Sequence, residues 1–185
     1  VQDSWETNVA KMPTSRIDFG IAAVNGKIFV IGGTSGHTIP DGHMATVEVY
    51  DPVLNIWETK TPMPAPRREL TCGVIDNKIY VAGGSPTGYW GSNTNKLDVY
   101  DPATDTWDTN RADMKVRLFG PSGAVINGKF YLVGGMNANF YGQSVVQIYD
   151  PLTDKWELGP YLNYARAGHT VNVVNGKLYA IGGLS

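Results

Sequence analysis

The sequence has very little cysteine, because Cys72 is the only one among its 185 residues. A single thiol cannot form a disulfide within the chain, so packing and hydrogen bonds have to hold the fold. None of the asparagines begins an Asn-Xaa-Ser/Thr glycosylation site. These absences favour a reducing compartment such as the cytoplasm. A secreted protein whose signal peptide has been removed is the alternative.

The chain also lacks an excess of charge of one sign and a long apolar run. It contains 15 Lys and Arg and 17 Asp and Glu, which gives a formal net charge of −2. A general nucleic-acid-binding protein carries a basic surplus, so we expect no nucleic-acid partner. No apolar stretch is long enough to span a membrane, and the residues from Val1 onward do not resemble a signal peptide, so we expect no membrane association.

A helical pattern is missing as well. No segment of about ten residues or more repeats its apolar residues with the 3.6-residue period of a helix, so we expect essentially no helix. Turn-forming residues are plentiful instead, with 22 glycines and 11 prolines, and hydrophobic residues make up an ordinary 42%. This composition is typical of an all-β protein with many short strands.

Three landmarks recur in a constant order about 50 residues apart. Paired glycines follow an apolar run at residues 32–33, 83–84, 134–135 and 182–183. A Tyr-Asp-Pro triplet follows at Tyr50, Tyr100 and Tyr149, and a tryptophan stands seven residues after each of these tyrosines, at Trp57, Trp107 and Trp156. Trp5 fits the same spacing one repeat earlier. The chain is therefore a run of repeats.

Each repeat contains four short candidate strands. The first two are joined by Asn-Gly at residues 25–26, 127–128 and 175–176, and by Asp-Asn at 76–77. Asn-Gly between apolar residues is the strongest short-range signal of a β-hairpin, because a type I′ turn needs positive φ at both positions. We expect first strands such as 20–24 and 168–174, second strands at 27–31, 78–82, 129–133 and 177–181, third strands at 47–50, 97–100 and 145–149, and fourth strands around each tryptophan.

The order Gly-Gly, Tyr, Trp with this period resembles the kelch repeat, and the resemblance covers nearly the whole chain. It implies an all-β, kelch-type β-propeller of about 3.5–4 four-stranded antiparallel blades, in which stacking of the blades covers their apolar faces. Such a resemblance is specific for the fold and says much less about function.

The strands divide the chain unevenly. We assign residues 1–14 to the last strand of a preceding blade, residues 15–65, 66–115 and 116–164 to one blade each, and residues 165–185 to the first two strands of a further blade. An open stack leaves apolar blade faces bare. We therefore expect these blades to belong to a larger ring, or a homo-oligomer in which another copy completes the propeller.

The longer and more varied connections are expected on one face. Because neighbouring strands are antiparallel, the connections from second to third strands share a face with those from a fourth strand to the next first strand. Two of these loops carry adjacent aromatic residues, Tyr89-Trp90 and Phe140-Tyr141. Tyr and Trp are common anchors of recognition surfaces, so we predict these four as ligand contacts. The alternative is that they fold back over a neighbouring blade.

Arginines end the connections that lead into the first strands: Arg16, Arg67 with Arg68, Arg117 and Arg166. Converging guanidinium groups suit carboxylate or phosphate ligands. The resemblance implies the same, since similar arginines line the ligand face of kelch adaptors that capture acidic peptide motifs for ubiquitin ligases. The alternative is that they brace one blade on the next by bonding backbone carbonyls, which we favour for Arg16, Arg117 and Arg166. We predict Arg67, Arg68 and Arg117 as ligand contacts, with Arg117 open to either role.

The other reactive side chains form no convincing catalytic set. His37, Asp41 and His43 share one loop, but their spacing is unspecific and a structural zinc needs four firm ligands. Cys72 lies among small residues of an inner strand, as a buried structural thiol would, and His169 lies on an innermost strand. We therefore expect no catalytic residue, no metal and no cofactor.

These observations predict a non-catalytic scaffold that binds a protein or peptide ligand through a loop face, and the arginines would suit an acidic one. Two alternatives stay open. One is a kelch-type enzyme similar to sugar-acid epimerases or to copper oxidases, since an arginine–histidine site at the channel mouth is compatible with the sequence. The other is a structural repeat module that self-assembles.

Overall fold

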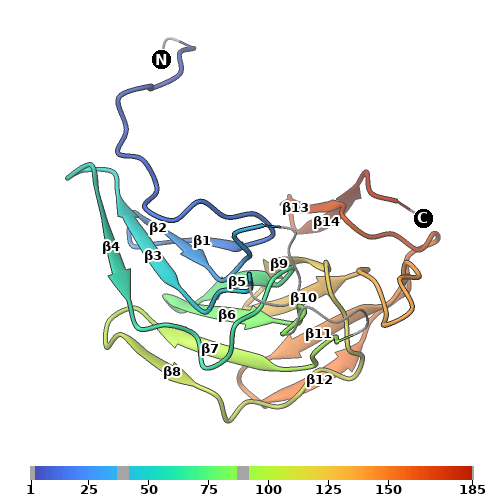
Figure 1. Ribbon diagram of the computed structural model, residues 1–185. Helices are drawn as coiled ribbons and strands as arrows, with labels where there is room; N and C mark the ends of the chain where they lie inside the picture. The colour runs from blue at the N-terminus through green and yellow to red at the C-terminus, as the bar shows by residue number, and fades with distance from the viewer. Residues whose placement is uncertain (1–2, 37–41, 87–91, 185) are drawn as a thin grey trace.

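The computed structural model describes residues 3–36, 42–86 and 92–184 and confirms the all-β prediction for them. These residues form fourteen strands and no helix, hence no helix that could cross a membrane. The strands make three four-stranded antiparallel sheets and one two-stranded sheet, which are the blades of the propeller (Figure 1).

Each blade runs outward in chain order. Blade 1 contains β1 (Gly20–Val24), β2 (Lys27–Ile31), β3 (Val47–Asp51) and β4 (Ile56–Lys60). Blade 2 contains β5 (Thr71–Ile75), β6 (Lys78–Ala82), β7 (Leu97–Asp101) and β8 (Thr106–Asp108). Blade 3 contains β9 (Ser122–Ile126), β10 (Lys129–Val133), β11 (Val146–Asp150) and β12 (Lys155–Leu158). The partial blade contains β13 (Thr170–Val174) and β14 (Lys177–Ile181). The first strands contact one another in the order β1, β5, β9, β13.

The hairpin turns have the backbone that the sequence predicts. Asn25 and Gly26 have φ of 50° and 74°, and the Asp76-Asn77 turn has φ of 50° and 60°. Positive φ at both central residues is the signature of the type I′ turn, whose twist matches that of the strands. Asp and Asn tolerate this left-handed region better than most residues, so the second repeat keeps the turn without a glycine.

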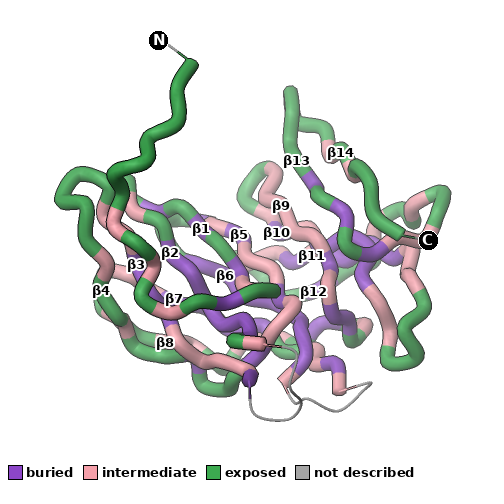
Figure 2. The backbone as a smooth tube through the Cα atoms, turned by 45° about the horizontal axis from the view of Figure 1, so that its top comes forward, coloured by how far each residue is buried: buried purple, intermediate pink, exposed green. Residues whose placement is uncertain are grey.

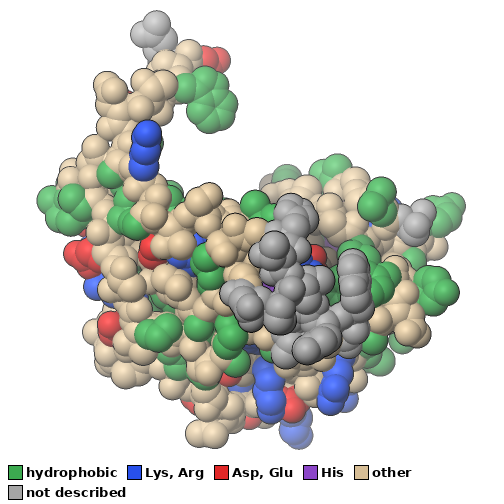
Figure 3. All heavy atoms as spheres, in the orientation of Figure 1, with side chains coloured by type: hydrophobic (Ala, Val, Ile, Leu, Met, Phe, Trp, Pro, Cys, Tyr) green, Lys and Arg blue, Asp and Glu red, His purple; other side chains and the backbone are tan. Residues whose placement is uncertain are grey.

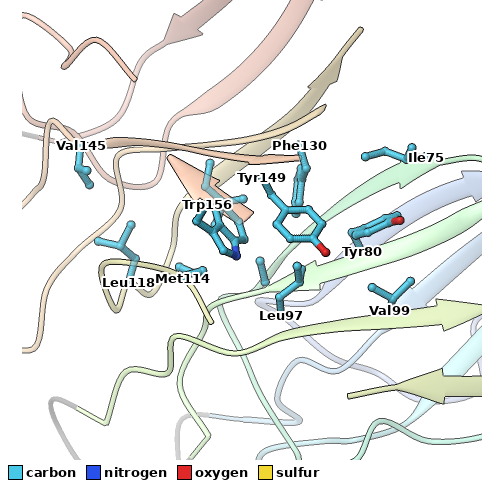
Figure 4. Packing of buried hydrophobic residues seen from close by; sticks show 12 residues of the cluster. Ile75, Tyr80, Leu97, Val99, Met114, Leu118, Phe130, Val145, Tyr149 and Trp156 are labelled. Atoms are coloured by element: carbon cyan, nitrogen blue, oxygen red, sulfur yellow. The ribbon is translucent and has the colours of Figure 1, made fainter. Parts of the chain in front are cut away.

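The blades pack face to face through two large apolar clusters. The cluster between blades 1 and 2 includes Phe29, Ile31, Ile79 and Tyr100. The cluster between blades 2 and 3 includes Tyr80, Leu97, Phe130, Tyr149 and Trp156 (Figure 4). Burial of such surface is worth about 25 cal/mol per Å², so these two interfaces are the core of the molecule. In Figure 2 the buried stretches run through these blades, whereas β14 has no fully buried residue.

The repeated tyrosine and tryptophan tie each blade to the chain before it. The hydroxyl of Tyr149 donates to Oδ1 of Asp154 at 2.6 Å, and its ring lies 5.1 Å from that of Trp156. Nε1 of Trp156 donates to the carbonyl of Ala112 at 2.9 Å. Blade 2 repeats the arrangement with Trp107 donating to Thr61 at 3.0 Å. The tryptophan of each repeat therefore bonds the chain of the preceding blade, and the tyrosine packs against this tryptophan.

The segment before blade 1 lies outside the sheets. Residues 3–12 form no strand, and Trp5 is 95% exposed on a segment that points away from blade 1 (Figure 1). The first anchors are Asn8, whose carbonyl accepts from Nδ2 of Asn55 at 3.1 Å, and Ala10. The amide of Ala10 donates to Oδ1 of Asn55 at 2.6 Å, and its carbonyl accepts from Nε1 of Trp57 at 2.9 Å. The assignment of residues 1–14 to a fourth strand stays a prediction.

Candidate recognition face

The two sets of longer connections lie together, as the alternation of strand directions predicts. The residue after each glycine pair bridges to a residue that precedes a first strand. These bridges join Ile17 to Thr34, Arg68 to Ser85, Phe119 to Met136 and Ala167 to Leu184. We call the surface built by these connections the recognition face.

The glycine pairs make the close approach of neighbouring blades possible at this face. Gly32 and Gly33 have φ of 65° and 93°, a region that glycine enters without strain. The amide of Gly33 donates to the carbonyl of Arg67 at 2.8 Å, which joins blade 1 to the chain leading into blade 2. A Cβ on Gly32 would lie 2.5 Å from the same carbonyl oxygen. A side chain here would push the two blades apart.

Arg16 and Arg67 are internal braces of their blades. Arg16 donates to the carbonyl of Gly32 at 3.0 Å and forms a buried ion pair with Glu48. Arg67 is only 2% exposed and binds Asp98 and the carbonyl of Gly83 in the same way. Burial raises the pKa of Asp98, and the charge of Arg67 opposes this rise. Arg16 bonds backbone carbonyls as the bracing interpretation expects, but it does so within blade 1 and not from one blade to the next. Arg67 offers almost no surface to a ligand.

Blade 3 replaces this ion pair with an uncharged arrangement. Leu118, four residues before β9, stands where Arg16 and Arg67 stand before β1 and β5. The acid of the third strand is replaced by Gln147, which is fully buried and binds the amide and carbonyl of Val116 at 2.8 and 3.0 Å. Arginine and acid are thus lost together, so the buried site holds no unpaired charge.

Arg68 and Arg117 are the predicted arginines that reach the surface. The side chain of Arg68 is 22% exposed and lies 3.9 Å from Asp18, at the outer limit of an ion pair. Arg117 is exposed, and it forms no hydrogen bond or ion pair among the described residues, so the bracing that we favoured for it is not made. Leu118, next to Arg117, accepts a backbone hydrogen bond from Gly84, next to Ser85. The two arginines therefore flank the segment that follows β6.

Two acidic residues beside Arg68 have an unusual backbone at the inner ends of the blades. Asp18 and Glu69 have φ of 56° and 54°. The amide of Glu69 donates to the carbonyl of Asp18 at 2.7 Å, and the carbonyl of Glu69 accepts from Gly120 at 2.8 Å. Burial raises the pKa of Glu69, and the charge of Arg68 opposes this rise. These bonds connect three blades around the inner rim, and the carboxylates of Asp18 and Glu69 both lie near the charge of Arg68.

Phe140 and Tyr141 sit on a tight turn in the loop between β10 and β11. Oδ1 of Asn137 accepts from the amides of Asn139 at 2.9 Å and Tyr141 at 3.2 Å, and Phe140 has φ of 63°. The ring of Phe140 packs edge-on against Phe119 at 5.2 Å, so it covers its own blade, whereas the alternative interpretation expected it to cover a neighbouring blade. Tyr141 is 70% exposed, so most of its surface remains open to a ligand.

A pocket opens beside this turn. It has a volume of about 330 Å³ and lies between the blade 3 loop and the segment leading into the partial blade. Its lining is mostly apolar: Met136, Phe140, Gly142, Ala167, Gly168 and Leu184. Figure 3 shows exposed hydrophobic side chains on the same C-terminal side of the molecule. Pockets of this size and polarity accept an apolar group of a ligand.

Tyr89 and Trp90 lie outside the described residues, and so do His37 and Asp41. The structure therefore brings Phe140 and Tyr141 together beside the pocket and places Arg68 and Arg117 on the neighbouring blade boundary. It separates Arg67 from them by burying it.

The groups considered for catalysis lie in packed surroundings. Burial raises the pKa of the Cys72 thiol to about 12, as expected for a structural cysteine. Burial also lowers the pKa of His169, and the nearby charge of Arg166 lowers it further. Across residues 3–36, 42–86 and 92–184, no three His, Cys, Asp or Glu side chains are grouped as metal ligands.

A comparison with family models matches residues 2–183 to the KLHDC2/KLHL20/DRC7 Kelch-repeats domain. The chain belongs to the kelch-repeat family. The match spans all blades described above, so the Gly-Gly, Tyr and Trp contacts are those of kelch repeats in this chain.

Several kelch proteins are similar in sequence. Kelch-like protein 15 from Danio rerio is 32% identical over 198 residues, which cover 97% of this chain and 31% of the relative. Kelch repeat and BTB domain-containing protein 12 from Homo sapiens is 30% identical, covering 89% of the chain and 29% of the relative. Beta-scruin from Limulus polyphemus is 31% identical, covering 99% and 20%. The chain spans about a third or less of the length of these kelch relatives.

The fold is also similar to a solved structure. The protein in "Structure of YjhT" superposes with a TM-score of 0.79 over 96% of this kelch chain and 68% of the other. The sequences share 18% identity, so this similarity shows the β-propeller fold alone. Together with the strands of Figure 1, it confirms the predicted kelch-type propeller.

Proposed function

We propose that this chain is a non-catalytic kelch scaffold that binds a protein or peptide through its recognition face. The observation that carries the proposal is the mostly apolar pocket of about 330 Å³ beside Tyr141, whose side chain is 70% exposed. An exposed tyrosine next to an apolar pocket is a typical anchor point of an interface. The packed blades beneath keep both in place without help from the ligand.

The proposed ligand carries an apolar side chain for the pocket and carboxylates for the surface arginines. Arg117 is exposed and Arg68 is partly exposed on the adjoining blade boundary, so both are available to acidic groups. Arg68 already lies beside Asp18 and Glu69, which reduces its attraction for a further anion. Arg117 is therefore the stronger candidate for an acidic contact.

The name of one relative supports a scaffold role, because it describes kelch repeats combined with another domain. Kelch repeat and BTB domain-containing protein 12 is named as an assembly of modules, and the kelch chain corresponds to 29% of it. Repeats used as one module in a longer protein suit a binding unit. We infer the protein or peptide class of partner from this and from the face itself.

The experiment selects peptides from a random phage-displayed library on the immobilised chain and measures their affinity by fluorescence anisotropy. We expect the selected peptides to be acidic with one large apolar residue. Tyr141→Ala and Arg117→Ala should each weaken binding by about tenfold, as loss of a contact at an interface hot spot does. Trp90→Ala combined with Arg68→Ala tests the other half of the predicted face.

A matched control lies on the opposite face. Leu152 is 93% exposed in the turn after β11, and Leu152→Ala should leave the affinity unchanged. Peptides whose binding survives all the recognition-face substitutions would contradict the proposal. Turnover of a sugar acid or alcohol by the purified chain would contradict it in favour of the enzyme alternative.

A further inference from the structure

The outer edge of β12 borders a groove. β12 is the fourth strand of blade 3 and pairs only with β11 among the described residues, so its other edge lies at the rim of the propeller (Figure 1). A groove with a volume of about 550 Å³ is lined by residues 154–158 and by Ala112, Asp113 and Lys115 of the connection before blade 3. Successive side chains of a strand point to opposite faces, so a groove that touches every residue of β12 runs along its edge. We call it the outer groove.

The backbone of β12 leaves two residues unpaired at this edge. The amide of Gly159 donates to the carbonyl of Val146 at 2.9 Å, which shows which residues of β12 bond β11. Bonded positions alternate along an antiparallel pair, so the N–H and C=O groups of Trp156 and Leu158 point to the groove, and those of Glu157 point to β11. No backbone hydrogen bond joins Trp156 or Leu158 to the described part of the connection. Such an edge is a template for another strand.

The connection before blade 3 runs beside β12 in the same direction. At one end the amide of Ala112 donates to Oδ1 of Asp154, the residue before β12, at 3.1 Å. At the other end Val116 bonds the side chain of Gln147, which lies opposite the last residue of β12. Lys115 precedes Val116, so it lies at the end of the groove where β12 finishes.

Two lysines without an ion-pair partner lie at the two ends of the outer groove. Lys155 begins β12 and Lys115 lies where β12 ends, and both are exposed. They lie on opposite faces of β12, because Lys155 alternates with Trp156, whose indole bonds the connection. Asp113, also in the lining, is already paired with Lys96 at 2.9 Å. Within the described ranges, neither Lys115 nor Lys155 forms an ion pair.

Glu157 is the acid on β12 that a ligand has to avoid. It stands two residues after Lys155 and therefore on the same face of the strand. On β4 of blade 1 an acid and a lysine with this spacing bind each other, since Glu58 and Lys60 lie 2.7 Å apart. Lys155 and Glu157 form no such pair in the structure described, so the charge of Lys155 is left for a ligand.

We propose that the outer groove binds an extended segment of a partner protein as a fifth strand of blade 3, and that this segment carries two acidic residues three positions apart. Side chains three positions apart on a strand lie on opposite faces, as Lys155 and Lys115 do. β12 itself is four residues long, so the two acids reach both ends of the groove in either direction of the segment. The residue opposite Glu157 is uncharged or basic.

The backbone and the lysines divide the work of recognition. Main-chain bonds to Trp156 and Leu158 supply affinity, and the lysines supply specificity, as in other cases of strand addition. The outer groove shares no lining residue with the apolar pocket beside Tyr141, so this proposal does not rest on the function proposed above.

The test titrates the full chain with three capped peptides by NMR. Each has two threonines at both ends, and their central residues are Glu-Val-Thr-Glu, Lys-Val-Thr-Lys and Glu-Val-Glu-Thr. We expect the first peptide to bind about fivefold more tightly than the others or better, since this is the upper range for an exposed ion pair. In the third peptide the acids share one face, so one of them meets Glu157. Equal affinity of the three peptides would overturn the proposal.

Strand addition has a signature that binding through charge alone lacks. With the first peptide at saturation, hydrogen exchange at the amides of Trp156 and Leu158 should slow. The amide of Glu157 should not change, because it already bonds β11. Unchanged exchange at Trp156 and Leu158 would overturn the added strand. A dimer in light scattering that Lys155→Glu dissociates would also overturn it, because a second copy would then occupy the edge.

Charge reversal locates the bound peptide. Lys155→Glu and Lys115→Glu should each weaken the first peptide by about fivefold or more, because an ion pair becomes a contact of like charges. Lys60→Glu, on the outer strand of blade 1, is the matched control and should leave the affinity unchanged, and so should Tyr141→Ala. An equal loss with Lys60→Glu or Tyr141→Ala would overturn the placement in the outer groove. The peptide comparison on the unaltered chain tests the proposal even if a lysine variant does not fold.

Discussion

Arg16 donates a hydrogen bond from Nη2 to Oε2 of Glu48 at 2.7 Å, and both side chains are buried inside blade 1. Oε1 of Glu48 also accepts from the hydroxyl of Thr14 at 2.6 Å. The pair is therefore satisfied by hydrogen bonds, which a buried pair of charges needs to compensate for its loss of water. Blade 3 shows that the same fold tolerates an uncharged replacement at this site.

Removing one partner of the Arg16–Glu48 pair should lower the free energy of unfolding much more than replacing both partners with uncharged residues. Glu48→Ala leaves Arg16 charged and unpaired, so we expect the free energy of unfolding to fall by about 3–5 kcal/mol. The double variant Arg16→Leu with Glu48→Gln copies Leu118 and Gln147 and should recover most of this loss. Urea unfolding followed by tryptophan fluorescence measures both. A double variant as unstable as the single one would show that the two arrangements are not equivalent.

Substitution of a glycine in the glycine pairs should destabilise the fold far more than substitution of a glycine in the hairpin turns. Gly26 has φ of 74° with nothing near its missing Cβ, so Gly26→Ala costs only backbone strain of about 1–2 kcal/mol. Gly32→Ala adds a clash with the carbonyl of Arg67 at 2.5 Å and should cost clearly more. The two unfolding midpoints in urea make the comparison, and equal midpoints would mean that the blades separate easily at this point.

The hydrogen bond from Tyr149 to Asp154 predicts a pH-dependent stability. This bond is the main reason that the pKa of Asp154 is lowered in the folded chain. A carboxyl with a lowered pKa contributes stability above its unfolded pKa of about 3.9, and the contribution is lost as the pH falls through the folded pKa. Tyr149→Phe should therefore cost about 1 kcal/mol near neutral pH and progressively less below about pH 4.

Blade 1 supplies the control for this prediction. Tyr50 donates to Oδ1 of Asn55 at 2.8 Å, and an asparagine does not titrate. The cost of Tyr50→Phe should stay constant between about pH 7 and pH 3, as measured by denaturant unfolding at each pH. Parallel pH profiles for the two variants would exclude Asp154 as the source of the dependence.

The cysteine should be unreactive while the chain is folded. Because burial raises the pKa of Cys72 to about 12, almost no thiolate is present near neutral pH, and the thiol packs between blades 1 and 2. We expect the thiol reagent DTNB to modify it only as fast as the chain opens, and quickly in urea. Rapid stoichiometric modification of the native chain would show that the interface between blades 1 and 2 opens readily.

The repetitive parts of this fold could be predicted from the sequence because each rests on local chemistry. Asn25-Gly26 defines a turn by its own backbone preference, and the apolar alternation beside it defines the strands. The third strands differ slightly from the prediction, since β11 begins at Val146 and every third strand includes the Asp of the triplet. An Asp or Asn also stands five residues after each of these tyrosines and accepts a hydrogen bond from its hydroxyl. This recurring acceptor was visible in the sequence, but the repeat spacing alone did not predict its role.

The candidate site could be predicted less well because it depends on burial. Arg67 and Arg68 are adjacent in sequence, yet Arg67 turns into the blade and Arg68 lies at the rim. Arg117 is one position away from the bracing site, which Leu118 occupies. The residue at the second position of each third strand indicates whether the arginine is buried. It is an acid where a buried arginine is present, and it is Gln147 in blade 3, where none is.

The exposed segment ahead of Ala10 is a suitable place to attach a label. Hydrogen bonds to Asn55 and Trp57 fix the chain at Asn8 and Ala10, and residues 3–7 ahead of them are exposed and make no strand. A fluorophore or an immobilisation tag attached to this segment would hang from the outer side of blade 1 without loading any blade. Surface-coupled chains would then present their loops uniformly to the medium, which is the geometry that a biosensor requires.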